Sequence, residues 1–246
     1  MIPRILHQIW VGGDPLPDDF ARYRQTWLEH HPEWEHHLWT EDNLPPDLRR
    51  QEGYERLRVP AERSDILRYE VLWKFGGVYV DTDFECHRAL DPFVEGLNFV
   101  IAPLKPNGWV NGAFMGATAE HPIIDRALTE LTPREFHGYD KHGTGPRFLD
   151  KLLEDYPEIT RLPPELFYQT SPTQLADAVA THHAAGSWKS VDSYRKGVKL
   201  AEQRNFELRG QIESLEKELE ATKARLARAE ARSGGGRGLF ARAFGR

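Results

Sequence analysis

The sequence predicts an α/β fold with a largely parallel sheet, because short apolar runs alternate with segments of helical periodicity over the first 190 residues. A hydrophobic content of 39% in a chain of 246 residues is sufficient for the core of a domain of ordinary size. The net charge of −6 argues against a nucleic-acid partner, which would favour a basic domain. We expect a domain over residues 1–190, a helical extension over 191–232 and a flexible basic tail over 233–246.

The first half of the domain shows each element in turn. Residues 2–10 are apolar, rich in isoleucine and followed by a glycine-rich loop, which indicates a buried strand. A polar helix is expected over residues 18–30 and a second strand over 35–39. Apolar residues at helical spacing predict a helix over 61–75, and the two glycines that follow are typical of a helix C-terminus. The chain then enters a strand at residues 78–80.

The second half continues the alternation. We expect strands over residues 99–102 and 113–117, and helices over residues 123–131 and 147–153. The single cysteine, Cys86, has no partner for an intramolecular disulfide and is expected to be an idle, buried thiol. The apolar start of the chain is too short for a signal peptide, and no run is long enough to span a membrane. A cytoplasmic protein is the expectation from these features.

The C-terminal extension has the pattern of a coiled coil over residues 193–232, which contain no proline. Its apolar positions alternate steps of four and three: Leu208, Ile212, Leu215, Leu219, Thr222, Leu226 and Ala229. A homodimer through this seam is the prediction, and a single helix lying on the surface of the domain is the alternative. The tail that follows, GLFARAFGR, carries arginines among apolar residues, so it would suit peripheral contact with an anionic membrane or remain disordered.

The stretch with the clearest chemistry is Asp81, Thr82 and Asp83, directly after the strand at residues 78–80. Open α/β sheets bind their ligands at the carboxyl ends of strands. Two carboxylates this close repel each other unless a cation or a proton neutralises them, so the pair suggests a metal with oxygen ligands. By itself, an Asp-x-Asp sequence is equally consistent with a solvated loop.

The helix before this strand carries Asp65 and Arg68, which lie three residues apart and so share one face. The glycine turn at the end of the helix could return that face to the strand end. The arginine there could pair with a carboxylate or a phosphate, and the aspartate could accept hydrogen bonds from a sugar. The alternative is an ion pair within the helix on a solvated surface.

Together these segments resemble glycosyltransferase family 32, the DXD-containing sugar transferases that include fungal mannosyltransferases and are related to the glucosylating domains of large clostridial toxins. The likeness covers roughly the first 190 residues. It rests on IPRILHQIWVGG, ERSDILRY followed by GGVYVDTDF, WVNGAFMGA, HGTGP and HHAAGSW. It implies a GT-A fold, with a Rossmann-like sheet, and a donor that is a nucleotide sugar.

The resemblance also implies roles for individual residues. Trp10 matches the tryptophan that stacks on the donor base, for which a flat aromatic face is suited; plain core packing is the alternative. Asp65 and Arg68 match residues that hold the donor sugar, with Arg68 also near the diphosphate. Asp81 matches a position that contacts ribose and sugar, and Asp83 matches the direct metal ligand; these four charged residues are the candidate catalytic residues. The other donor-binding candidates are Ile9, Val11, Ser64, Tyr79, Thr82, Asn111, Ser187 and Trp188.

A further metal ligand is expected in the segment HHAAGSW, where the family also has a flexible lid over the diphosphate. His183 is the first candidate and His182 the second, since imidazole suits Mn²⁺ beside carboxylates, with Mg²⁺ as the alternative ion. Ser187 and Trp188 would close over the phosphates.

These assignments predict a metal-dependent, retaining transfer of a hexose, with a front-face displacement because no residue stands out as a covalent nucleophile. A UDP sugar is expected rather than a GDP sugar, and the acceptor is a glycan, a lipid-linked glycan or a protein. One alternative is an inactive scaffold that binds sugar nucleotides. Another is a phosphohydrolase of the haloacid dehalogenase type, but that class expects Thr or Val at the position of Glu85.

Overall fold

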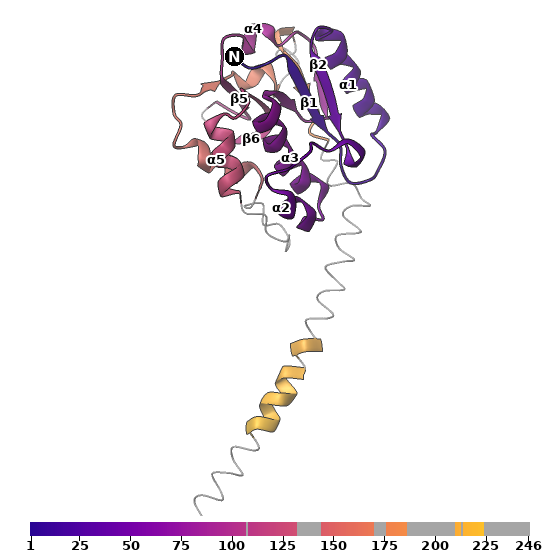
Figure 1. Ribbon diagram of the computed structural model, residues 1–246, viewed down its shortest axis with the longest axis vertical. Coiled ribbons are helices and arrows are strands. Elements are labelled where there is room, and N and C mark those ends of the chain that lie inside the picture. The colour runs from indigo at the N-terminus through magenta and orange to yellow at the C-terminus, as the bar shows by residue number, and fades with distance from the viewer. Residues whose placement is uncertain (107, 132–143, 170–175, 186–209, 213, 224–246) are drawn as a thin grey trace, which may run out of the picture. The chain divides into compact units, whose positions relative to one another are not determined.

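The computed structural model describes residues 1–106, 108–131, 144–169, 176–185, 210–212 and 214–223. Contacts along the chain divide it into two compact units, Met1–Trp188 and Lys189–Arg246. The first unit is an α/β domain, as predicted, and its main helices lie against a mixed sheet (Figure 1).

The main sheet has six strands in the order β2-β1-β3-β6-β5-β7. Their bounds are β1 Ile5–Ile9, β2 Glu35–Trp39, β3 Gly77–Val80, β5 Phe99–Pro103, β6 Val110–Ala117 and β7 Thr160–Arg161. β1 is parallel to both β2 and β3, and β7 is parallel to β5, whereas β6 is antiparallel to both of its neighbours. Five strands therefore run in one direction and β6 runs against them, so the sheet is mostly parallel. A second, two-stranded antiparallel sheet pairs β4 (Phe84–Cys86) with β8 (Ala180–His182).

Two hydrophobic clusters cover the two faces of the main sheet. One includes residues of α3 (Pro60–Phe75), α5 (Pro122–Glu130) and α6 (Pro146–Leu153). The other includes Trp27 of α1 (Asp18–His30) and residues of β4 and β8. Neighbouring residues of β3 alternate between the clusters, because successive side chains of a strand point to opposite faces. The other helices described in the first unit are α2 (Gln51–Arg56), α4 (Asp91–Val94) and two short 3₁₀ turns, Glu41–Asn43 and Pro164–Leu166.

The turn from α3 into β3 is formed by two glycines with positive φ, 65° at Gly76 and 99° at Gly77. A Cβ atom on Gly77 would lie 2.5 Å from the carbonyl oxygen of Ile5, so no other residue fits there. The buried His7 side chain of β1 holds the turn, because its Nε2–H donates to the Gly76 carbonyl at 2.8 Å while Nδ1 accepts from the indole N–H of Trp39 at 3.1 Å. These contacts fix the direction in which β3 leaves the helix.

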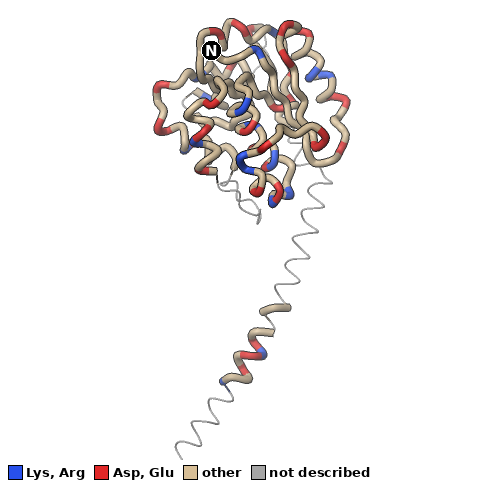
Figure 2. Tube along the Cα trace, viewed as in Figure 1, with Lys and Arg blue, Asp and Glu red and all other residues tan. Residues whose placement is uncertain are grey.

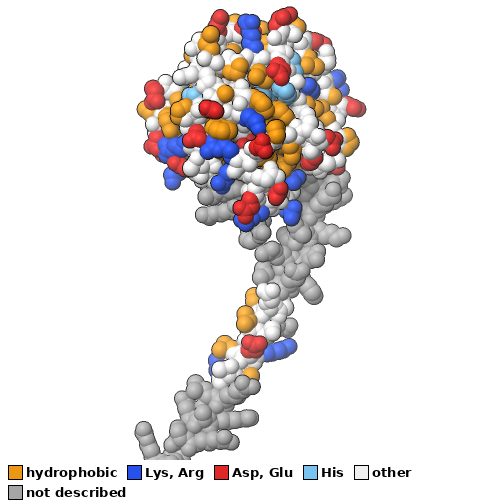
Figure 3. All heavy atoms as spheres, viewed as in Figure 1, with side chains coloured by type: hydrophobic (Ala, Val, Ile, Leu, Met, Phe, Trp, Pro, Cys, Tyr) orange, Lys and Arg blue, Asp and Glu red, His pale blue; other side chains and the backbone are white. Residues whose placement is uncertain are grey.

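In the second unit, residues 210–212 and 214–223 are helical. Ile212, Leu215 and Leu219 are exposed at 54%, 64% and 54%, on the apolar seam that the sequence pattern predicted, and apolar side chains are visible on this segment in Figure 3. The rest of the predicted coiled coil and the predicted basic tail lie outside the described residues. Over the first unit, acidic and basic residues are interspersed along the trace (Figure 2). Among the helices that the structure describes, none is long and apolar enough to cross a bilayer.

Candidate active site

The carboxyl end of β3 carries Asp81 and Asp83. The Asp81 N–H donates to the carbonyl of Ala113 at 2.9 Å, which continues the pairing of β3 with β6 past the last strand residue. The hydroxyl of Tyr79, on the same side of the strand, donates to Asp81 Oδ1 at 2.6 Å. Burial raises the pKa of Asp81, and the nearby Arg68 charge opposes that rise. The strand and its glycine turn therefore fix Asp81 at the sheet edge where ligands of open α/β sheets bind.

The α3 face that carries Asp65 and Arg68 does return to this strand end. An Arg68 Nη2 atom lies 2.9 Å from Asp65 Oδ1 and 3.7 Å from Asp81 Oδ1. The guanidinium carbon lies 4.9 Å from the centre of the Tyr79 ring. With side chains only 9% and 14% exposed, Arg68 and Asp65 form a buried pair and not the solvated pair that was the alternative. Burial alone lowers the pKa of Arg68, but Tyr79 and the two aspartates outweigh it and raise the pKa, so the guanidinium stays charged.

The pKa of the Asp65 carboxyl is raised to about 6. The largest cause is burial, which the Arg68 charge and a hydrogen bond from Thr144 Oγ1 at 2.9 Å partly offset. Thr144 lies just before α6, so this hydrogen bond links α3 to the start of α6.

Asp83 lies beside His182, which comes from β8. The pairing of β4 with β8 places Phe84 opposite His182, and the two rings stack at 4.4 Å. His182 Nε2 is then 3.3 Å from Asp83 Oδ1, and the Ala185 N–H donates to Asp83 Oδ2 at 3.0 Å. Burial acts to raise the pKa of Asp83, but the His182 hydrogen bond and charge and the Ala185 N–H outweigh it and lower the pKa. Asp83 is thus held as a carboxylate.

Asp81, Asp83 and His182 each offer one ligand atom, and these three atoms lie within 4.8 Å of one another. Among the described residues this is the group of acidic, histidine and cysteine side chains that could hold a metal ion. Two carboxylate oxygens and one imidazole nitrogen are a donor set that suits Mn²⁺, and the oxygens also suit Mg²⁺. The residues therefore fit the divalent metal that the Asp-x-Asp pattern suggested.

His183, the first choice of ligand from the sequence, does not join this group. Its Nε2 lies 3.0 Å from Glu85 Oε2, and its ring stacks on Tyr23 at 4.2 Å. The physical reason is that consecutive residues at a strand end face opposite sides, so only one of two adjacent histidines can reach Asp83. His182, the second choice, lies with Asp81 and Asp83 instead, so the structure favours His182 over His183 as the candidate ligand.

Asn111 on β6 is tied into the same cluster. Its backbone carbonyl accepts from Arg68 Nη1 at 3.3 Å, and its side-chain oxygen accepts from the hydroxyl of Tyr168 at 2.9 Å. The next residue, Gly112, has φ of 70°, and a Cβ there would lie 2.8 Å from Arg68 Nη1. Sequence reasoning assigned no role to Thr144 or Tyr168. Thr144 lies in the segment HGTGP (residues 142–146), which contributed to the family resemblance without a role for the threonine. The sequence around Tyr168 has no motif that would indicate a functional residue.

The other donor-binding candidates lie at the ends of β1, α3 and β3. Ile9 and Val11 are buried, and the indole N–H of Trp10 donates to the Asp14 carbonyl at 2.7 Å while the ring meets Phe20 edge-on. β1 and β3 pair in parallel through Leu6–Val78 and His7–Tyr79, so continuing this register brings residues 9–11 beside 81–83. Thr82 is buried and Ser64 is half-buried next to Asp65. Ser187 and Trp188 lie outside the described residues.

Comparisons with known proteins agree with this site. The sequence profile of the family described as "Glycosyltransferase sugar-binding region containing DXD motif" matches residues 17–100. The chain is 32% identical over 171 residues to mannosyl phosphorylinositol ceramide synthase SUR1 of Saccharomyces cerevisiae, covering 63% of this chain and 43% of the relative. It is 26% identical over 209 residues to inositol phosphoceramide mannosyltransferase 1 of Schizosaccharomyces pombe, covering 78% and 64%. The chain thus spans less than two thirds of the length of these relatives.

Among solved structures, the fold is similar to that of the PaToxG glycosyltransferase, with a TM-score of 0.52 at 17% identity, covering 63% of this chain and 70% of that one. At this identity the likeness concerns the fold. The GT-A architecture, the aspartate pair at the end of β3 and the profile match point to the same conclusion. Residues 17–100 of this chain match the sugar-binding region of the DXD-containing glycosyltransferases, and the fold is of the GT-A class.

Proposed function

We propose that this chain transfers a hexose from a nucleotide diphosphate sugar to a hydroxyl acceptor, with retention of anomeric configuration and with a divalent metal at Asp83 and His182. The observation that carries the proposal is the convergence of Asp81, Asp83 and His182 within 4.8 Å at the end of β3, next to the buried Arg68. The match of the DXD family to residues 17–100 supports the reaction class.

When bound, the metal would supply Lewis-acid stabilisation of the leaving diphosphate. Asp83 and His182 would hold it, and Asp81, which Tyr79 and Arg68 already orient, offers a third ligand atom beside them. Arg68 is held charged by Asp65 and Asp81, so it can stabilise negative charge on the diphosphate. Asp65 is placed to accept hydrogen bonds from sugar hydroxyls.

The transfer step breaks the bond between the anomeric carbon and the diphosphate oxygen, and the electron pair leaves with the diphosphate. A new bond forms between the acceptor oxygen and the anomeric carbon. The proton of the acceptor hydroxyl passes to the departing phosphate oxygen on the same face. Trapping a glycosyl adduct on any side chain would contradict this front-face course.

The donor itself is open to a direct test. The sequence favours a UDP sugar, whereas the relatives named as mannosyltransferases favour a mannosyl donor. Thermal-shift measurements with UDP-glucose, UDP-galactose and GDP-mannose, each with and without Mn²⁺, would identify the donor by the one that raises Tm only when the metal is present.

The chain provides matched controls for the site. Asp83→Asn and Glu85→Gln change two nearby carboxylates that contact different histidines, Asp83 with His182 and Glu85 with His183. His182→Gln and His183→Gln make the matched change in the imidazoles. We expect Asp83→Asn and His182→Gln to lower metal-dependent donor hydrolysis by about 100-fold or more, the scale of a lost transition-state contact. Glu85→Gln and His183→Gln should retain it. If the wild type hydrolyses no donor, the result would support the alternative of an inactive scaffold. If His183→Gln lowers donor hydrolysis and His182→Gln does not, the assignment of His182 as the metal ligand is wrong.

We also propose that the C-terminal helix associates with a second copy of the chain. Ile212, Leu215 and Leu219 are spaced three and four residues apart, as in a coiled-coil seam, and all are exposed in the single chain. Replacing all three with Ser should convert a dimer to a monomer in light scattering and leave donor hydrolysis unchanged. A variant that stays dimeric would show that the interface lies elsewhere.

A further inference from the structure

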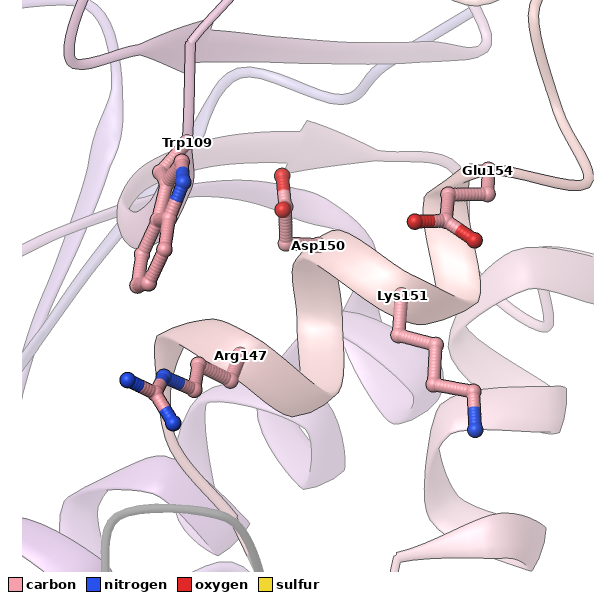
Figure 4. A pocket seen from close by; sticks show the side chains of 5 residues that line it. All are labelled: Trp109, Arg147, Asp150, Lys151 and Glu154. Atoms are coloured by element: carbon pink, nitrogen blue, oxygen red, sulfur yellow. The ribbon is translucent and has the colours of Figure 1, made fainter.

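A pocket of about 430 Å³ lies between the start of β6 and one face of α6. It is lined by Trp109, Arg147, Asp150, Lys151 and Glu154. Arg147, Asp150 and Lys151 lie on α6, and Glu154 follows its last residue at the same helical spacing, so the four form one stripe. Figure 4 shows Trp109 opposite Arg147 and Asp150. Trp109 is 53% exposed, and it is the exposed one among the tryptophans that the structure describes. The pocket is open to solvent, so the indole is accessible for stacking on a ligand.

Both walls of this pocket continue directly into the proposed donor site. Trp109 comes two residues before Asn111, whose carbonyl accepts from Arg68. Trp109 directly precedes β6, and two residues of extended chain span about 7 Å at most. Arg147 comes three residues after Thr144, whose hydroxyl donates to Asp65. The pocket is thus joined to the Asp65–Arg68 pair on two sides by short, hydrogen-bonded connections.

The pocket is also built to keep its shape. The N–H of Val110 donates to Asp150 Oδ1 at 3.3 Å, which ties the strand to the helix. The guanidinium of Arg147 lies 5.3 Å from the centre of the Trp109 ring and supports the indole. Leu149, Leu152 and Leu153 on the opposite side of α6 are buried in the core, so the helix cannot turn its polar stripe away.

The chemistry of the lining indicates what it would bind. An aromatic surface packs against the C–H face of a saturated ring, while carboxylates accept hydrogen bonds from hydroxyls and cationic side chains donate them. Two cations and two carboxylates balance in charge, whereas a site for a phosphate would be positive throughout. The combination fits a neutral ring with many hydroxyls.

Resting on the transfer reaction proposed above, we propose that the pocket of Trp109 and α6 is the acceptor subsite and takes a neutral, hydroxyl-rich ring. The acceptor is then either a pyranose of a glycan or a cyclitol, held so that one hydroxyl is directed toward the anomeric carbon beside Asp65 and Arg68. Trp109 supplies the stacking surface, and Glu154 and Lys151 bind hydroxyls. Asp150 keeps the pocket open through its bond to Val110.

Direct binding to the whole chain tests this without turnover. Saturation-transfer NMR would use methyl α-D-mannopyranoside, myo-inositol and mannose 6-phosphate as probes, with the wild type and four variants. We expect one or both neutral rings to bind the wild type more tightly than mannose 6-phosphate. Trp109→Ala should weaken that binding at least 10-fold, and Trp109→Phe should restore most of it. Glu154→Ala should weaken binding, while Glu158→Ala, an exposed carboxylate outside the pocket lining, should not.

The outcomes separate the subsite from the reaction. Donor hydrolysis, measured on the same preparations, reports the reaction apart from the subsite, because water replaces the acceptor in that assay, and it should be unchanged in the control Glu158→Ala. Absence of donor hydrolysis in the wild type would count against the transfer reaction, and the NMR result would still decide the subsite. The subsite is refuted if no neutral ring binds, if Trp109→Ala binds as well as the wild type, or if the phosphorylated sugar binds best. Comparing mannoside with inositol then distinguishes the glycan from the cyclitol source.

Discussion

Replacing Gly112 with alanine tests whether the position of Arg68 governs transfer. Gly112 has φ of 70°, and an added Cβ would lie 2.8 Å from Arg68 Nη1 and 3.1 Å from a methyl group of Leu149. Ordinary contact begins at 3.4 Å, so the guanidinium must retreat by about 0.6 Å. Arg68 has little room to do so, since it is 9% exposed and held by Asp65 and Asn111.

Gly96→Ala is the matched control. Gly96 has φ of 77°, close to that of Gly112, but no atom lies within 4 Å of the Cβ position. Both variants should lose about 1 kcal/mol of unfolding free energy from the positive φ, measured by urea denaturation. Only Gly112→Ala should also lower donor hydrolysis, by roughly 100-fold, the scale expected when a catalytic group is misplaced by a fraction of an ångström to 1 Å. Equal hydrolysis by the two variants would refute the reasoning that places Arg68 in the site.

Three further predictions concern other groups. His7 is fully buried as a neutral ring whose Nδ1 accepts from Trp39, which lowers its pKa from 6.5 to about 4, chiefly by burial. Between pH 6.5 and pH 4 the unfolded chain therefore binds more protons than the folded chain, so acid favours unfolding. On going from pH 7 to pH 5, the unfolding free energy of the wild type, measured by urea denaturation, should fall by about 2 kcal/mol more than that of His7→Gln. Equal losses in the two proteins would contradict this prediction. Burial raises the pKa of the Cys86 thiol to about 12, so the native protein should react with a thiol reagent such as DTNB only on unfolding, and rapid native labelling would exclude the described packing. Tyr168→Phe removes the hydrogen bond to Asn111 and should cost about 1 kcal/mol in thermal unfolding; an unchanged Tm would show that the bond adds no net stability.

Much of the fold could be predicted because its signals are local. The helix at α3 and its glycine ending follow from apolar spacing and from the freedom of glycine at positive φ. β2 and α1 begin and end at the predicted residues, and β1 (Ile5–Ile9) lies within the segment 2–10 predicted as a strand but begins three residues later. The antiparallel direction of β6 was not foreseen, because strand direction depends on which strands meet in space and not on the residues within one strand.

For the site, the convergence of the charged residues could be predicted from the sequence, but the identity of the histidine beside Asp83 could not. Asp65, Arg68, Asp81 and Asp83 lie on adjacent elements, so their convergence follows from one helix, one turn and one strand. The choice between two adjacent histidines depends instead on the register of β8 against β4, which joins segments far apart in the sequence. A one-residue shift in a strand exchanges its two faces, and no pattern in the segment HHAAGSW fixes that shift.

The contact between β4 and β8 also determines when the site can exist. The Ala185 N–H reaches Asp83 across 102 residues of chain, and closing a loop of that length costs on the order of 4 kcal/mol in chain entropy. A chain emerging from the ribosome would display both aspartates long before His182 is available to them. An ion bound by all three residues would then slow the detachment of β8 from β4 and protect this edge of the domain from proteases.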